Sequence, residues 1–221
     1  MKKEDLLIAF AKELPRNARL LDVGCGTGKA IKRIREIRPD IAMVAMDMED
    51  TGAFLPEGVE FHRAMIDDMK GKLLENSFDA VICQHVIEHL LYPTVLMEEA
   101  KKVLKPGGKF FLETPNWTRI FIPFHPNFFW ADYTHVRPYA PQTVRRLFSD
   151  YGFELQALKT VSSGSMFIRG DSFKKIHTSS IQTEGKATRG RTEGGIMRKI
   201  FLRLINPLLK DVLVAVGENK K

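Results

Sequence analysis

An apolar run that passes directly into three evenly spaced glycines constrains this chain more than any other feature. Residues 19–23 read Arg-Leu-Leu-Asp-Val, and Gly24, Gly26 and Gly28 follow at every second position. A strand that ends, turns sharply and starts a helix needs residues that tolerate positive φ, and a ligand lying against bare backbone needs residues without a side chain. The pattern therefore predicts a strand, a ligand-binding turn and a helix over Lys29–Ile37.

Two carboxylates accompany the glycines. A second apolar run, Ile41–Met46, ends at Asp47, whose carboxylate can accept hydrogen bonds from both hydroxyls of a ribose. Asp22 precedes the glycines, and a carboxylate there suits an ammonium group better than a phosphate. The dinucleotide fingerprint is spaced G-x-G-x-x-G, so the spacing found here disfavours an NAD-dependent oxidoreductase. We therefore expect a nucleoside cofactor with a cationic end.

Apolar runs and helical patterns alternate along the chain. Expected helices beyond the first are Leu91–Leu104 and Pro141–Tyr151, and Lys105–Gly108 reads as a turn that no helix crosses. Several runs are continuously apolar, as in strands buried on both faces. The expected strands are Arg19–Val23, Ile41–Met46, Val59–Arg63, Phe78–Cys83, Lys109–Glu113, Phe153–Val161 and Val212–Gly217. This order predicts an α/β fold with a doubly wound, mostly parallel seven-stranded sheet.

Length and composition fit one such domain over residues 1–221. With 221 residues, 44% of them apolar, the chain can close one α/β core with little left for a second. Two cysteines form no disulfide framework, residues 1–5 lack the apolar region of a signal peptide, and no apolar run reaches the length of a membrane span. These features predict a cytoplasmic protein. The formal net charge of +7 falls on residues 161–221, a basic surface whose commonest role is solubility.

Further blocks carry a family resemblance. They are Asp22-x-Gly24-x-Gly26-x-Gly28, Ser77–Leu90, Leu104–Lys109, Thr114–Asn116 and Tyr133–Tyr139. Together they resemble the class I S-adenosylmethionine-dependent methyltransferases, in particular type 11 and type 12 domains, whose best-known relatives are the ubiquinone-biosynthesis O-methyltransferases. The resemblance implies a Rossmann-like fold whose last strand is antiparallel and lies beside the sixth. It also implies S-adenosyl-L-methionine as the cofactor.

The resemblance assigns a set of cofactor-binding positions. They are Asp22, Gly24, Cys25, Gly26, Gly28, Asp47, Met48, Met65, Ile66 and Gln84. Asp22 would serve the methionine end and Asp47 the ribose. Met65 stands where the family usually has an acid near the adenine amino group; we therefore expect Met65 and Ile66 to sandwich the ring while backbone groups or Asp67 reach its edge, or else Met65 and Met69 to fill core.

Methyl transfer needs a base only if the group that accepts the methyl arrives protonated. His85 is then the first candidate, with His135 and Asp132 as alternatives, because histidine titrates near neutral pH. The segment from His85 to His89 also satisfies H-x-x-E-H, so His85, Glu88, His89 and His135 form an alternative metal site, similar to E-x-x-E-H sites of small-RNA 2′-O-methyltransferases. Glu88 and His89 also match residues of metal-free relatives, and we expect no metal.

Two inserts should select the acceptor. Residues 114–140 carry many aromatic side chains and read as a substrate lid, or else as a flap packed on the core or on another subunit. Residues 162–210 read as a basic mobile loop and an amphipathic helix ahead of the last strand, and 196–209 could touch a membrane surface or pack on the domain. The oligomeric state is not predicted.

These patterns predict methyl transfer to a small-molecule or lipid-linked acceptor, at oxygen, without a nucleic-acid partner. One alternative is RNA 2′-O-methylation with a divalent metal, which would require a phosphate-binding basic groove. Another is a noncatalytic S-adenosylmethionine-binding protein, because a domain can keep a cofactor loop and lose its acceptor pocket.

Overall fold

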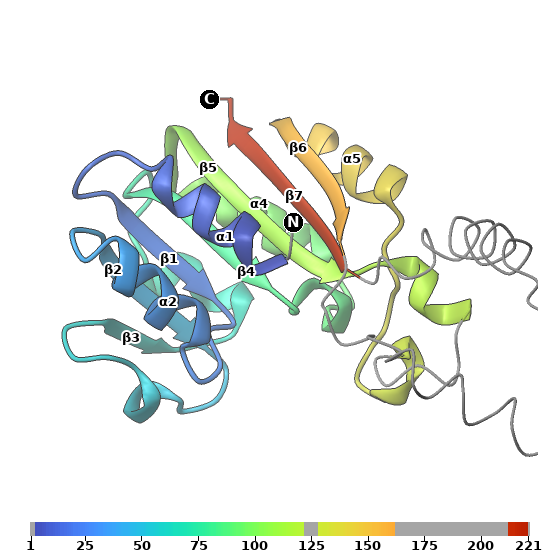
Figure 1. Cartoon of the computed structure of the whole chain (residues 1–221), viewed down its shortest axis with the longest axis horizontal. Helices are drawn as coiled ribbons and strands as arrows, with labels where there is room; N and C mark the ends of the chain where they lie inside the picture. The colour runs from blue at the N-terminus through green and yellow to red at the C-terminus, as the bar shows by residue number, and fades with distance from the viewer. Residues whose placement is uncertain (1–2, 122–127, 162–211, 221) are drawn as a thin grey trace, which may run out of the picture.

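A computed structural model describes residues 3–121, 128–161 and 212–220 of the chain. These residues form one seven-stranded sheet in the order β3-β2-β1-β4-β5-β7-β6 (Figure 1). The strands are β1 Arg19–Val23, β2 Ala42–Asp47, β3 Glu60–Arg63, β4 Phe78–Gln84, β5 Leu104–Pro115, β6 Phe153–Val161 and β7 Val212–Asn219. The pairs β1–β2, β1–β4, β2–β3 and β4–β5 are parallel, whereas β7 runs antiparallel between β5 and β6. The predicted Rossmann-like topology is confirmed.

Helices cover both faces of the sheet. In Figure 1, α1 and α2 lie in front of the strands and α4 lies behind them. The α-helices are α1 Lys3–Lys12, α2 Lys29–Ile37, α3 Met69–Lys72, α4 Pro93–Val103 and α5 Pro141–Asp150. Short 3₁₀ turns are η1 Gly52–Phe54, η2 Ile66–Asp68, η3 Ile87–His89, η4 Trp117–Phe121 and η5 Phe129–Ala131.

Two apolar layers result from the alternation of side chains along each strand. Phe110 and Leu112 of β5 pack with residues of α4 and α5, whereas the intervening Phe111 packs with residues of α1 and α2. Side chains at successive strand positions point to opposite faces, so one continuous apolar run supplies both layers. The sheet is therefore a rigid platform that fixes the positions of its strand ends.

The structure differs from the expected elements in two places. The N-terminal helix α1 has no counterpart among the expected helices, although Leu6, Leu7 and Phe10 lie in one of the apolar layers. Strand β5 begins at Leu104 rather than at Lys109, because the expected turn is a bulge inside it; the pairing with β4 jumps from Leu104 to Lys109. Gly107 adopts a left-handed φ of 75° in that bulge.

The two expected inserts are described only in part. Residues 114–121 and 128–140 contain 3₁₀ turns and no α-helix among their described residues. The expected loop and amphipathic helix of 162–210, and the expected membrane contact of 196–209, lie outside the described residues. Among the helices that are described, none has the length and apolar character needed to cross a lipid bilayer.

Candidate functional site

The glycine turn after β1 needs its glycines for two different reasons. All three adopt left-handed φ, at 74° for Gly24, 49° for Gly26 and 72° for Gly28. A Cβ atom at Gly24 would lie 2.2 Å from Cγ2 of Val86, and one at Gly28 would lie 2.6 Å from Cδ2 of Leu55. A Cβ at Gly26 would meet nothing within 4 Å. Gly24 and Gly28 thus permit close packing, whereas Gly26 keeps backbone open toward the surroundings.

The Asp47 carboxylate ties this turn to the end of β2. Its Oδ2 accepts a hydrogen bond from the Gly26 N–H (2.8 Å), and its Oδ1 accepts one from the Glu49 N–H (3.0 Å). A carboxylate oxygen has more than one acceptor position, so both bonds leave capacity for a ligand hydroxyl. Asp47 therefore orders the turn and also lies where a ribose is expected.

Two cavities adjoin at the ends of the parallel strands and share Gly24 and His85 in their walls. The first, of about 370 Å³, is lined by Leu7, Asp22, Gly24, Cys25, Lys29, Ala30, Arg33, Gln84, His85 and Glu113. The second, of about 440 Å³, is lined by Val23, Gly24, Met46, Asp47, Met48, Ala64, Met65, Ile66, Asp67, His85, Val86, His89 and Leu90. We call the first the acidic cavity and the second the methionine-lined cavity. A ligand that fills both must pass between Gly24 and His85.

Asp22 is a buried carboxylate without a full set of partners. Asp22 is only 2% exposed, and its Oδ2 has no hydrogen-bond partner among the described residues. Burial, assisted by the charge of Asp47, raises the pKa of Asp22 to about 7. An unsatisfied buried acceptor of this kind is costly unless a ligand donates to it. The site is therefore suited to a cationic donor in the acidic cavity.

The cofactor positions expected from the sequence gather around these cavities. Cys25 and Gln84 line the acidic cavity, and Met48, Met65 and Ile66 line the methionine-lined cavity. Met48 is 64% exposed and Met65 is 56% exposed, so neither side chain fills the core. Their thioethers are free to pack on a flat ligand. Gly26 and Gly28 shape the turn without lining either cavity.

His85 bridges two buried carboxylates. Its Nε2 lies 2.9 Å from Oε1 of Glu113, and its Nδ1 lies 3.2 Å from Oε1 of Glu88. Burial lowers the pKa of the imidazole, but the hydrogen bonds to Glu113 and Glu88 outweigh burial and raise the pKa to about 9. His85 is therefore an imidazolium at neutral pH, and in this state it lacks the lone pair that proton removal requires.

The other two expected catalytic residues lie apart from the cavities. Asp132 and His135 line neither of them, although Nε2 of His135 is 3.8 Å from Oδ2 of Asp132. His135 instead packs against His89, with ring centroids 4.8 Å apart. His89 does line the methionine-lined cavity, so the pair extends from that cavity toward residues 128–135.

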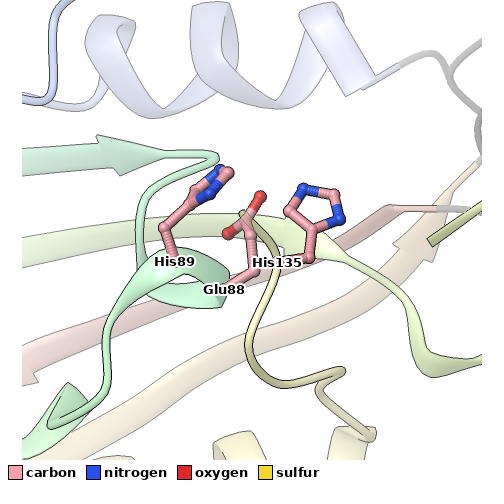
Figure 2. A group of neighbouring side chains, drawn as sticks. All are labelled: Glu88, His89 and His135. Carbon is pink, nitrogen blue, oxygen red and sulfur yellow. The ribbon is translucent and has the colours of Figure 1, made fainter. Parts of the chain in front are cut away.

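Glu88, His89 and His135 form a cluster of potential metal ligands (Figure 2). One donor atom from each lies within 4.8 Å of the other two. Figure 2 shows the Glu88 carboxylate between the two imidazole rings. Both oxygens of Glu88 already accept hydrogen bonds, Oε1 from His85 and Oε2 from Thr114 Oγ1 (3.0 Å). These donors could hold a divalent cation, and the absence of a metal stays a prediction.

Three residues of the acidic cavity escaped the sequence analysis. Lys29 and Arg33 project from α2, one helical turn apart, and Glu113 lies two residues before the end of β5. Glu113 is fully buried and also accepts a hydrogen bond from Nε2 of Gln84 (2.9 Å). Glu113 could have been found from the sequence, because it is the last residue of the expected strand Lys109–Glu113 and so lies at the same sheet edge as Asp22. With these residues the cavity presents both carboxylates and cations.

The cavity walls fit the cofactor that the sequence resemblance implies. S-adenosylmethionine has a nucleoside, a sulfonium and a zwitterionic amino-acid end. Asp22 offers an unsatisfied acceptor for the α-ammonium, Lys29 and Arg33 offer positive charge for the α-carboxylate, and Asp47 offers acceptors for the ribose. Each half of the molecule thus matches the chemistry of one cavity.

Comparisons with known proteins agree with this geometry. A family model described as a methyltransferase domain matches residues 2–158. The ubiquinone biosynthesis O-methyltransferase of Xanthomonas axonopodis pv. citri (strain 306) is 33% identical over 114 residues, which cover 47% of this chain and 46% of that protein. The chain thus spans about half the length of the curated relatives it matches.

Solved structures share the fold at low sequence identity. A SAM-dependent methyltransferase from Archaeoglobus fulgidus has a TM-score of 0.70 at 17% identity, covering 97% of this chain and 92% of that one. The geranyl diphosphate C-methyltransferase of Streptomyces coelicolor A3(2), crystallised with Mg²⁺, geranyl diphosphate and S-adenosyl-L-homocysteine, has a TM-score of 0.64 at 12% identity, covering 98% and 78%. With the family match over residues 2–158, the chain belongs to the methyltransferase domain family, within the class I S-adenosylmethionine-dependent methyltransferases.

Proposed function

We propose that this protein transfers a methyl group from S-adenosylmethionine to an oxygen of a small-molecule or lipid-linked acceptor. The observation that carries the proposal is the pair of adjoining cavities, with Asp22 in one wall, Asp47 in the other, and Gly24 and His85 shared between them. The acceptor class is supported by the curated relatives, which are named ubiquinone biosynthesis O-methyltransferases.

The cofactor-binding roles follow from the cavity walls. Asp22 accepts from the α-ammonium, Asp47 accepts from the ribose hydroxyls, and Met65 and Ile66 pack on the adenine. Gly24 and Cys25 let the backbone of the turn approach the ligand. When bound, S-adenosylmethionine supplies an electrophilic methyl group. The protein then has to exclude water and hold the acceptor oxygen in line with that carbon. Holding the two reactants in this orientation lowers the activation barrier, because their translational and rotational entropy is already lost on binding.

Proton removal from a neutral hydroxyl is assigned to His135, which packs on His89 at the edge of the methionine-lined cavity, with Asp132 as the alternative. Nδ1 of His135 is hydrogen-bonded to the backbone carbonyl of Phe129, so in the neutral tautomer Nε2 carries the lone pair. Asp132 is the weaker base, because hydrogen bonds from Thr134 lower the pKa of its carboxyl. His85 was the first candidate from the sequence, but both of its ring nitrogens are bound to carboxylates.

A second candidate function is methylation of an RNA 2′-hydroxyl with a divalent cation. It is favoured by one observation, the cluster of Glu88, His89 and His135. A cation held there would lower the pKa of a bound hydroxyl and orient it. The competing hydrogen bonds of Glu88 give this candidate second place.

The test is an acceptor screen that measures S-adenosylhomocysteine formation. Quinone precursors, phenols, sugars and short RNAs are each incubated with S-adenosylmethionine and the full-length protein, with and without EDTA. Turnover of a phenolic or quinone-precursor hydroxyl that survives EDTA supports the leading proposal. Turnover of RNA alone, lost with EDTA, moves the function to the second candidate. Cofactor binding without turnover on any class supports the noncatalytic alternative.

A further inference from the structure

His85 occupies an unusual backbone position at the end of β4. It is one of three non-glycine residues among those described with a positive φ, at 55°. Its N–H still donates to the carbonyl of Glu113 (2.9 Å), so the residue remains on the β4–β5 ladder while the chain turns away. The next residue, Val86, packs against Gly24 of the glycine turn. Left-handed φ is costly for a residue with a side chain and persists where the surroundings enforce it.

The side chain of His85 supplies that enforcement. It joins Glu113, which lies near the end of β5, to Glu88, which lies in η3. Each carboxylate receives a second hydrogen bond, Glu113 from Gln84 and Glu88 from Thr114. A carboxylate is an acceptor only, so both ring nitrogens of His85 act as donors. The five side chains form one network that crosses the ends of β4, β5 and η3.

This network lies at the passage between the two cavities. His85 and Gly24 are the residues that both walls share, and the His85 side chain is 38% exposed there. In the proposed function, the nucleoside of a bound cofactor lies in one cavity and its amino-acid end in the other. A ligand that spans both cavities therefore contacts His85 and Gly24.

We propose that His85 is a positioning residue that holds the passage between the two cavities. The inference rests on the proposed function, because it assumes a ligand that spans both cavities. Its two hydrogen bonds to buried carboxylates fix the segment from Gln84 to Glu88 against the glycine turn. A spanning ligand then binds without first ordering that segment, which preorganises the site.

The experiment compares a spanning ligand with a ligand for one cavity. Affinities for S-adenosylhomocysteine and for adenosine are measured by calorimetry on the full chain. We expect His85→Gln, which can donate to one carboxylate only, to weaken S-adenosylhomocysteine about tenfold, the usual effect of losing one charge-assisted hydrogen bond, and adenosine much less. His85→Arg should recover most of the affinity, since a guanidinium donates to two carboxylates and cannot act as a base.

The matched control is His62→Gln. His62 also pairs with a glutamate, Glu60 (2.7 Å), but it lies on β3 and lines neither cavity, so both affinities should stay unchanged. Equal losses for the two ligands in His85→Gln, or no recovery in His85→Arg, would overturn the positioning role.

A measurement on the unaltered protein keeps the proposal testable if a variant fails to fold. In a ¹⁵N-labelled sample at neutral pH, both ring nitrogens of His85 should have the chemical shifts of protonated imidazolium. One unprotonated ring nitrogen would refute the two-carboxylate arrangement. Failure of the proposed function has a different signature, because the unaltered protein would then bind no S-adenosylhomocysteine while the nitrogen shifts could still be read.

Discussion

Cofactor affinity should depend on pH through Asp22. Burial raises the pKa of this carboxyl to about 7, so most of it is neutral at pH 6 and ionised at pH 8. The α-ammonium of the ligand binds the ionised form. With a pKa of about 7, roughly one tenth of the protein is ionised at pH 6 and roughly nine tenths at pH 8, so affinity for S-adenosylhomocysteine should rise about tenfold between these values.

The assay is calorimetry across this pH range with two proteins and two ligands. Asp22→Asn, which is isosteric and uncharged, should bind S-adenosylhomocysteine weakly and with a flat pH profile. Methylthioadenosine, which lacks the amino-acid end, should give a flat profile with the unaltered protein and thereby exclude other titrating groups. A flat profile for S-adenosylhomocysteine, or an equal slope for methylthioadenosine, would refute the reasoning.

Three further predictions concern the same crevice. The raised pKa of Asp22 means that the folded protein holds this proton more tightly than the unfolded protein, so the free energy of unfolding falls as pH rises from about 4 to about 7. Between pH 5 and pH 8 the unaltered protein should therefore lose roughly 3 kcal/mol of unfolding free energy that Asp22→Asn does not lose, measured by denaturant unfolding at both pH values. Asp47→Ala should weaken S-adenosylhomocysteine by about 1–3 kcal/mol, because it removes the ribose acceptor and the hydrogen bond from Gly26; unchanged affinity in calorimetry would remove Asp47 from the site. Gly24→Ala should lower the melting temperature strongly through its clash with Val86, whereas Gly26→Ala should cost folding only about 1–2 kcal/mol, because it adds backbone strain without a clash; equal thermal shifts would contradict this division.

Local sequence patterns predicted most of the sheet because its strands are buried on both faces. Runs such as residues 80–83 are apolar at every position, which leaves few alternatives to a central strand. The helix α1 was missed because its apolar residues Leu6, Leu7 and Phe10 become meaningful only when β5 supplies Phe111 to pack against. The bulge at Gly107 was read as a free turn for the same reason: pairing with a partner strand is not visible locally.

The site was predicted where one strand end determines the chemistry and missed where several meet. Asp22, Gly24 and Asp47 follow from positions on single strands, and the structure gathers them around two cavities. Whether His85 has a lone pair depends on Glu113, 28 residues away on the neighbouring strand. The contact could be expected only by aligning the ends of β4 and β5, which pair Gln84 with Glu113.

The insertion of β7 between β5 and β6 affects how this protein can diversify. Val212 pairs with both Pro115 of β5 and Val161 of β6, so the chain leaves and re-enters the sheet at one point on its rim. The sheet therefore holds residues 161 and 212 side by side, whatever sequence connects them. The length and composition of that sequence can change over generations without shifting a strand register, while Asp22 and Asp47, on strands farther across the sheet, keep their places.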